Sequence, residues 1–483
     1  MGGLRGFLLL GMPQSPHFFM KYTFKTKPWP HQKEGLIRAL KQRAIGFFWE
    51  PGTGKTKVVV DWAAAENMMQ HVQRVLIVCP LSVIGVWEDE LAVHCPVPYH
   101  FYPFTKDTKR VPRSKQLIVM VANYDVVWRR QELVEAYNPQ MVIADESHRI
   151  KKPSARRSMF FRKWRHAPYR AILTGTPTPK GFIDLYSQWV FLNDQRFGTN
   201  FQRFKDEFVR YGGFKGYQVR GYRNVDKLTR LIDMDAMVVR EDVLKLPKAV
   251  FQRVPVVLEP EARKAYDKMA YELFLELRDG EVSDAANVAV KILRLQQITG
   301  GWIKSDEGNI HQISEAKLVA SRERLEDLWN SDERVVVFAR FRPEVQALYD
   351  FGLRSGVPTH VVRGGQGRRE RDDARRRFQT ESGPSLFVAQ IQSGGLGITL
   401  HKARQGMFYS VTHALDDYEQ AYRRIRRGGQ VHRQRFQHLV GVNTIDIDIY
   451  ANLRGKKNLM DIIMKEPTAL ARSLATQLGI DEE

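Results

Sequence analysis

Short apolar runs recur along the first half of the chain, and stretches with helical periodicity separate them. The runs lie at residues 45–49, 74–79, 117–121, 141–144 and 169–173. Runs of this length that are apolar at nearly every position are typical of strands buried on both faces of a parallel sheet, with helices in the connections. The pattern therefore predicts an α/β unit over residues 25–245.

A second series of apolar runs lies at residues 334–338, 359–362, 385–389, 406–409 and 435–440. It predicts a second α/β unit over residues 326–455. The intervening residues 246–325 are mostly helical in pattern, and we interpret them as a linker with a small helical insertion. The predicted fold class is therefore α/β, with two parallel-sheet units in tandem and a small helical insertion between them.

The two ends of the chain carry weaker patterns. We interpret residues 1–24 as an N-terminal extension, with disorder as one alternative, and residues 456–483 as a C-terminal helical tail. No apolar run approaches the ~18 residues of a membrane-spanning helix, so we expect no membrane partner.

Charge and cysteine content narrow the function classes. The chain has 75 basic and 54 acidic residues, a formal net charge of +21. This excess favours a polyanionic partner, nucleic acid before an acidic membrane surface, although a soluble protein can also simply be basic. Cys79 and Cys95 are the only cysteines, which excludes a disulfide framework and a four-cysteine zinc site and suits a reducing cytosol.

A glycine-rich segment, Glu-Pro-Gly-Thr-Gly-Lys-Thr, follows the first apolar run. It resembles a phosphate-binding loop, in which bare amides cradle phosphate oxygens, a lysine reaches the β- and γ-phosphates, and a hydroxyl ligates Mg²⁺. The predicted ATP-binding residues of this loop are Pro51, Gly52, Thr53, Gly54, Lys55 and Thr56. The strict motif has glycine where this chain has Trp49, and a chance glycine-rich turn is the alternative.

Acidic and hydroxyl side chains follow the next apolar runs. Asp145 and Glu146 come directly after the run at 141–144, where a parallel sheet places its ligands. Asp145 would hold Mg²⁺, directly or through water, and Glu146 would orient and deprotonate the attacking water. An acidic turn is the alternative. Residues 174–176 (Thr-Gly-Thr) follow the run at 169–173 and are either an ordinary turn or a hydroxyl-rich link to the second unit.

A basic run at residues 423–427 follows the glycine-rich segment 393–399 of the second unit. An arginine supplied from a facing domain can stabilise the charge that develops during phosphoryl transfer, by about 10³–10⁵ in rate. A solvated or DNA-facing surface is the alternative.

The order of these motifs resembles the Swi/Snf-type translocases of helicase superfamily two, over residues 25–455. Residues 27–35 resemble the opening motif of that family, and residues 79–82, 145–148 and 175–177 resemble motifs Ia, II and III. Residues 239–247 resemble the signature that leads into the second lobe, which is the element most specific to the Swi/Snf branch. Residues 420–430 fit motif VI, Gln-Ala-x-x-Arg-x-x-Arg-x-Gly-Gln, at full length.

The resemblance implies two RecA-like lobes with ATP and Mg²⁺ between them. The catalytic residues it implies are Lys55, Asp145, Glu146, Arg424 and Arg427, and the metal ligands are Thr56 and Asp145. Gln32, as the reader of adenine, and Gly397 join the ATP-binding residues. The implied DNA contacts are Ser82, Tyr124, Gly394 and Gly395. The residues implied to couple the two sites are Thr174, Gly175, Thr176 and Gln420.

Two departures from the family pattern bear on the substrate. Thr178-Pro179-Lys180 replaces the usual Leu-Gln-Asn of motif III, and residues 410–417 lack the Asp-Trp-Asn-Pro of chromatin remodellers. With no chromatin-reader segment recognised, the chain resembles a minimal motor of the phage or bacterial kind. It is then expected in the cytoplasm of a bacterium or of an infected host.

The leading hypothesis is a DNA-dependent ATPase that translocates on double-stranded DNA and remodels forked or branched DNA in replication, recombination or repair. A strand-separating DNA helicase is the first alternative. A nucleotide-switched DNA-binding scaffold without productive turnover is a second, from a different class, and an RNA motor is a weaker rival.

Overall fold

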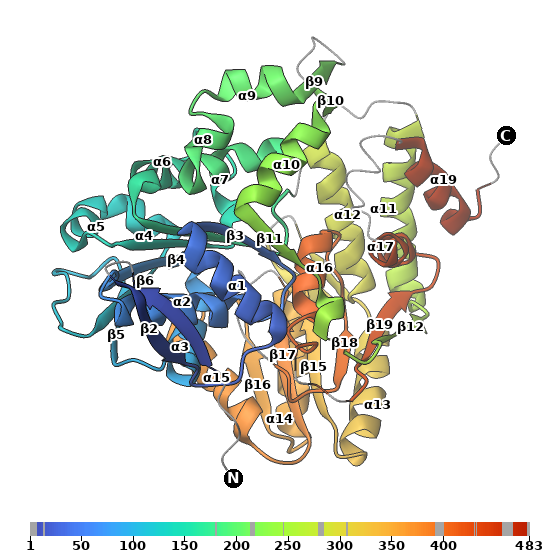
Figure 1. Ribbon diagram of the computed structural model, residues 1–483. Coiled ribbons are helices and arrows are strands. Elements are labelled where there is room, and N and C mark those ends of the chain that lie inside the picture. Colours follow the sequence, from blue (N-terminus) through green and yellow to red (C-terminus); the bar gives the residue numbers. More distant parts are fainter. Residues whose placement is uncertain are drawn as a thin grey trace. The chain divides into compact units, whose positions relative to one another are not determined.

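The computed structural model describes residues 7–12, 15–178, 181–212, 218–244, 246–278, 285–305, 308–391, 400–428, 430, 432–455 and 467–480 (Figure 1). The chain divides into two compact units, Met1–Lys245 and Leu246–Glu483. Three of the predicted site residues, Gly394, Gly395 and Gly397, lie outside the described residues.

The first unit is built on a seven-stranded sheet in the order β11-β3-β8-β7-β4-β6-β5. Its strands are β3 (Ala44–Trp49), β4 (Arg74–Cys79), β5 (Tyr99–Phe104), β6 (Leu117–Asn123), β7 (Met141–Asp145), β8 (Tyr169–Leu173) and β11 (Ala236–Val239). Every neighbouring pair is parallel, so the carboxyl ends of all these strands share one edge of the sheet.

Helices cover both faces of this sheet (Figure 1). On one face lie α1 (Pro30–Gln42), α2 (Lys55–Met68) and α3 (Ile84–His94), and on the other lie α4 (Tyr124–Arg129), α5 (Gln131–Tyr137), α6 (Arg156–Lys163), α7 (Leu185–Leu192), α8 (Asp194–Phe197), α9 (Phe201–Phe208) and α10 (Val225–Asp235). Within β4, Val75 and Ile77 join the first core cluster, whereas Leu76 and Val78 join the second. This two-sided burial is why the predicted strands are apolar without alternation.

The N-terminal residues, for which disorder was one interpretation, form a hairpin in their described part. Strand β1 (Phe7–Met12) pairs antiparallel with β2 (Ser15–Thr23). The hairpin is tied to the unit by Tyr22, which is buried and donates a hydrogen bond of 2.8 Å to Asp61 of α2. A second antiparallel hairpin joins β9 (Val209–Gly212) to β10 (Gln218–Tyr222).

The second unit is built on a six-stranded sheet in the order β12-β19-β18-β15-β17-β16, again with every pair parallel. Its strands are β12 (Val250–Val256), β15 (Arg334–Ala339), β16 (Thr359–Val362), β17 (Ser385–Gln390), β18 (Gln405–Phe408) and β19 (Arg435–Gly441). The α/β fold class predicted from the apolar runs is therefore confirmed for both units.

Helices also bury both faces of the second sheet. One core cluster takes in α11 (Pro260–Arg278), α12 (Ala285–Thr299), α15 (Arg368–Thr380), α16 (Leu415–Tyr422), α17 (Ile445–Arg454) and α19 (Pro467–Leu478). The other takes in α13 (Ala316–Asn330) and α14 (Arg342–Arg354). A short hairpin of β13 (Trp302–Lys304) and β14 (Ile310–Gln312) follows α12.

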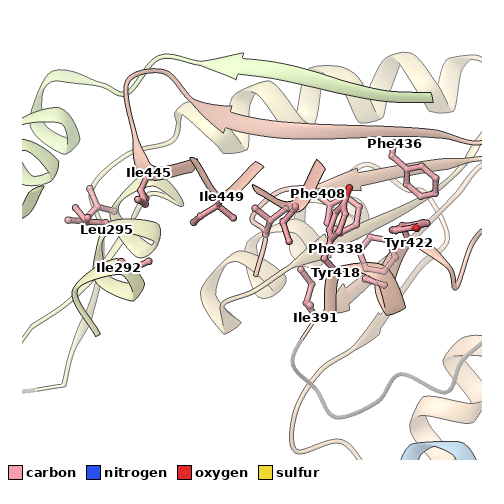
Figure 2. Close-up of a cluster of buried hydrophobic side chains, with 14 of the residues drawn as sticks. Ile292, Leu295, Phe338, Ile391, Phe408, Tyr418, Tyr422, Phe436, Ile445 and Ile449 are labelled. Atoms are coloured by element: carbon pink, nitrogen blue, oxygen red, sulfur yellow. The ribbon is translucent and has the colours of Figure 1, made fainter. Parts of the chain in front are cut away.

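Residues 246–325 differ from the linker and insertion that we expected. They supply β12, which pairs with β19 at the edge of the second sheet. They also supply α12, whose Ile292 and Leu295 belong to the same core cluster as Ile445 and Ile449 (Figure 2). The strand was missed because β12 reads Val-Phe-Gln-Arg-Val-Pro-Val, and an edge strand tolerates polar residues and proline that a central strand does not.

Candidate nucleotide site in the first unit

Three neighbouring strands bring the predicted catalytic segments together at one edge of the first sheet. Strands β3, β8 and β7 are adjacent, and Leu173 of β8 is in register with both Phe47 and Asp145. The phosphate-loop segment follows β3, residues 174–176 follow β8, and Glu146 follows β7. Sequence spacing of about 90 residues thus becomes spatial proximity because the strands are parallel.

The phosphate-loop segment has the backbone that its glycines predict. Gly52 and Gly54 have φ angles of 88° and 81°, a region that glycine adopts without strain. Helix α2 begins at Lys55, and no side chain caps its N-terminus. An uncapped helix N-terminus with a glycine-rich approach favours an anion, so these residues fit a nucleotide phosphate.

The first turn of α1 contacts the phosphate loop through two side chains. A ring nitrogen of His31 lies 2.9 Å from the Thr53 carbonyl oxygen. Gln32 is buried, donates to the Gly54 carbonyl at 3.3 Å and accepts from the Trp29 amide at 2.8 Å. The structure therefore places Gln32 beside the loop, and its contact with adenine stays a prediction.

Trp49, the departure from the strict motif, is the last residue of β3 and not part of the loop. Its ring is fully buried and lies edge-on to Phe47, with centroids 5.2 Å apart. The backbone carbonyl oxygens of Trp49 and Glu50 accept hydrogen bonds from the Lys55 ammonium. A Cβ atom at Gly175 would lie 2.8 Å from Pro51 Cδ, so the segment 174–176 abuts the phosphate loop closely enough to require glycine.

Asp145 is held by two donors and is costly to ionise. Its Oδ2 accepts from Trp87 Nε1 and its Oδ1 from the Glu146 amide, each at 3.0 Å. Burial, followed by the charge of Glu146, raises the pKa of Asp145 to about 7, although the Trp87 hydrogen bond and the Lys55 charge act in the opposite direction. A divalent cation beside this carboxylate would offset the desolvation, so the residue fits the predicted Mg²⁺ ligand.

Glu146 occupies a left-handed backbone conformation with φ of 55°, which is uncommon for a residue with a Cβ atom. Its carboxylate lies 3.5 Å from His148 Nδ1, and the same nitrogen lies 3.4 Å from Thr174 Oγ1. The Thr174 hydroxyl also accepts from the Thr176 amide at 3.1 Å. The structure therefore connects the predicted general base with the predicted coupling residues.

Tyr124 does not suit the DNA contact predicted for it. Its side chain is only 3% exposed and its hydroxyl donates to the Asp145 backbone carbonyl at 2.6 Å. Tyr124 is the first residue of α4 and packs in a core cluster, so it supports the acidic loop from the protein interior.

Ser82 lies in the short 3₁₀ helix Leu81–Val83 after β4 and is partly exposed, and its contact with DNA stays a prediction.

The second unit carries the predicted arginines just after α16. The Arg424 carbonyl oxygen accepts from the Leu400 amide at 2.9 Å, and the Arg427 amide donates to Gln430 Oε1 at 3.0 Å. Both side chains are partly exposed, as is Gln420 on α16. Arg423, by contrast, is buried and donates to Glu419 at 3.2 Å, which is a structural role.

Two residues that the motif analysis did not single out hold this site in shape. Trp87 donates to Asp145, and Gln188 contacts the residue after Glu146. Both lie on helices, α3 and α7, and neither helix carries a sequence signal for such a contact.

Among the described residues, no group of three or more His, Cys, Asp or Glu side chains is placed to hold a metal ion by itself. Across the same part of the chain, no helix has the length and apolar character needed to cross a membrane.

Family models match most of the chain. The model of the SNF2-related domain matches residues 31–300. The model of the helicase conserved C-terminal domain matches residues 320–429.

Curated relatives match over nearly the whole chain at low identity. The mouse DNA annealing helicase and endonuclease ZRANB3 is 27% identical over 91% of this chain and 41% of its own length. The ATP-dependent helicase MG018 of Mycoplasma genitalium is 23% identical over 92% of this chain and 43% of its own. A protein named p41, from Acyrthosiphon pisum secondary endosymbiont phage 1, is 26% identical over 92% of this chain and 98% of its own. The chain thus spans less than half of the first two relatives.

Proposed function

The chain belongs to the SNF2-related family of helicase-type ATP hydrolases, and from this premise we propose that it is a DNA-dependent ATPase that translocates on double-stranded DNA and remodels forked or branched DNA. The observation that carries the proposal is the meeting of the phosphate-loop segment, the Asp145–Glu146 pair and residues 174–176 at one sheet edge.

Each of these residues has a chemical task in the proposal. Lys55 and the amides at the start of α2 bind the nucleotide phosphates. Thr56 and Asp145 hold Mg²⁺, which when bound neutralises charge on the transferring phosphoryl group. Glu146 orients a water molecule and takes its proton, and the neighbouring His148 keeps the carboxylate in place.

The second unit contributes the remaining groups in the proposal. Arg424 and Arg427 stabilise charge on the phosphoryl oxygens, a role in which the residues of motif VI match the family pattern. The net charge of +21 supports a polyanionic partner. The relative ZRANB3 is named a DNA annealing helicase and endonuclease, which supports DNA as the partner proposed for this chain.

Steady-state ATP hydrolysis tests the proposal. The rate is measured without DNA and with single-stranded, duplex and four-way-junction DNA, for the wild-type chain and for Lys55→Ala. We expect duplex or junction DNA to raise the rate severalfold, and Lys55→Ala to lower it by at least about 10²-fold, as expected when a charge-stabilising group is lost. Absence of turnover under every condition would favour the nucleotide-switched scaffold, and stronger stimulation by RNA would favour an RNA motor.

Displacement assays separate translocation from strand separation. We expect the chain to displace a third strand from a triplex in an ATP-dependent manner. Efficient separation of a plain forked duplex would instead favour the alternative of a strand-separating DNA helicase.

A further inference from the structure

Gln188 on α7 is fully buried, and its side-chain amide makes hydrogen bonds to two different loops. Its Oε1 accepts from the Ser147 hydroxyl at 2.6 Å. Its Nε2 donates to the carbonyl oxygens of Pro177 and Asp184, each at 2.9 Å. One side chain thus connects the acidic loop after β7 with the loop after β8.

Two of the three partners of Gln188, Ser147 and Pro177, lie next to predicted functional residues. Ser147 directly follows Glu146, whose left-handed backbone sets the direction of the carboxylate. Ser147 is itself fully buried and begins the 3₁₀ helix Ser147–Ile150. Pro177 directly follows the predicted coupling residues Thr174–Thr176. A shift of either loop relative to the other therefore strains the amide.

Burial makes this connection strong. Water does not reach Gln188 or Ser147, so a lost hydrogen bond leaves an unsatisfied polar group and is not replaced by solvent. Another link between these loops, from His148 to Thr174, is longer at 3.4 Å, and its His148 end is partly exposed although Thr174 is buried. The Gln188 amide is thus better buried than the contact between His148 and Thr174.

We infer that Gln188 is a positioning residue for Glu146: it fixes the general base relative to the segment 174–177 and so carries movements of that segment to the carboxylate. It does not border the phosphate loop through any of these hydrogen bonds. Its loss should therefore slow hydrolysis without weakening ATP binding. The inference rests on the proposed hydrolytic role of Glu146.

A double-mutant cycle with kinetic readout tests this inference. Gln188→Leu, Ser147→Ala and the double variant are compared for kcat and KM for ATP, with and without duplex DNA. We expect each single variant to lower kcat by about 10- to 100-fold with KM changed less than about twofold, because a misplaced catalytic group affects the chemical step. The double variant should be no slower than Gln188→Leu, because both changes break the same contact.

Gln140→Leu is the matched control. Gln140 lies in the same unit at the opposite end of the strands, where its side chain accepts from the amides of Gln73 and Arg74 at 3.3 and 2.7 Å. Thermal unfolding is followed for every variant. The control should lose less stability than Gln188→Leu, because Gln140 is partly exposed, and should keep kcat.

Three results would overturn the inference: unchanged kcat in Ser147→Ala and Gln188→Leu, a rise in KM without a fall in kcat, or fully additive losses in the double variant. Should Gln188→Leu fail to fold, the kcat and KM of Ser147→Ala alone still test the inference, because either of the first two results can be observed with that variant. If the wild-type chain hydrolyses ATP but DNA does not stimulate it, the proposed DNA dependence fails, while the DNA-free kcat values still test Gln188.

Discussion

Two carboxyl groups, one in each unit, both have a raised pKa but lie in different surroundings. Asp145 follows β7 in the first unit, and Glu344 lies in the first turn of α14 after β15 in the second. Burial raises the pKa of each to about 7. A perturbed pKa alone would mark both as candidate catalytic groups.

Asp145 and Glu344 differ in their hydrogen-bond partners and in their exposure. Glu344 is fully buried, accepts from the amides of Arg340 and Phe341 at 3.2 and 3.0 Å and from the Ser410 hydroxyl, and its Oε1 leaves no space for a Cβ atom at Gly300. Asp145 is partly exposed and next to Glu146 and the phosphate loop. Access to a ligand, and not the pKa, therefore distinguishes the candidate site residue Asp145 from Glu344, whose role is structural.

The largest expected effect comes from a substitution in the phosphate loop beside Asp145. In Gly54→Ala the new Cβ atom would lie 2.1 Å from Gln32 Nε2 on a backbone with φ of 81°. Either the Gln32 side chain or the loop must move, so we expect ATP hydrolysis to fall at least about 10²-fold, as for a misplaced binding group. Nucleotide binding by titration and initial rates measure this.

Gly198→Ala is the control for backbone strain. Gly198 also has a positive φ, 66°, but nothing lies within 4 Å of an added Cβ atom. Because Gly198 combines this φ with a ψ of −177°, a region that is essentially restricted to glycine, the variant should lose about 1–3 kcal/mol of stability and no activity. Equal losses of activity in the two variants would mean that strain, not the loop's shape, explains Gly54.

A smaller effect follows from the protonation of Asp145. Because its pKa is raised to about 7, the folded state binds a proton that the unfolded state releases near pH 4, so its contribution to stability is largest in acid and is lost as pH rises through 7. Cation binding needs the ionised form, so kcat/KM for MgATP should be about tenfold lower at pH 6 than on the alkaline plateau.

Trp87→Phe sharpens this pH prediction. It removes a hydrogen bond that lowers the pKa of Asp145, so the acid limb of the profile should move to higher pH. Trp62→Phe is matched, since Trp62 is equally buried and donates to Glu66 at 3.2 Å, away from the loop. An unmoved limb in Trp87→Phe would show that a group other than Asp145 controls the profile.

The smallest effect concerns Tyr124. Tyr124→Phe loses the hydroxyl that donates to the Asp145 carbonyl, which should cost about 1 kcal/mol of stability. The DNA concentration that gives half-maximal ATPase stimulation should not change, because the side chain is buried. A clear rise in that concentration would instead support the DNA contact that the sequence predicted for Tyr124.

The sequence predicted the central strands and the motif loops because both are local features. Strands such as β4 and β7 are continuous apolar runs, and the phosphate loop follows directly after β3. Edge strands were harder: β5 reads Tyr-His-Phe-Tyr-Pro-Phe and β12 mixes polar residues with proline.

The supporting contacts of the site could not be predicted for a different reason. Trp87 and Asp145 are 58 residues apart, and Ser147 and Gln188 are 41 apart. Only the packing of α3 and α7 on the sheet brings these partners together, and no spacing in the sequence encodes it. The burial of Tyr124 is a property of the same packing.

The central claim is that the accessible carboxylates of the first unit hydrolyse the nucleotide while the enclosed carboxyl of the second does not. The most direct test compares Glu146→Gln with Glu344→Gln in steady-state ATP hydrolysis and in nucleotide binding. We predict that Glu146→Gln binds ATP normally but loses at least about 10²-fold in kcat, whereas Glu344→Gln loses stability and keeps kcat within about threefold. Equal kcat losses in both variants, or full turnover by Glu146→Gln, would contradict the account.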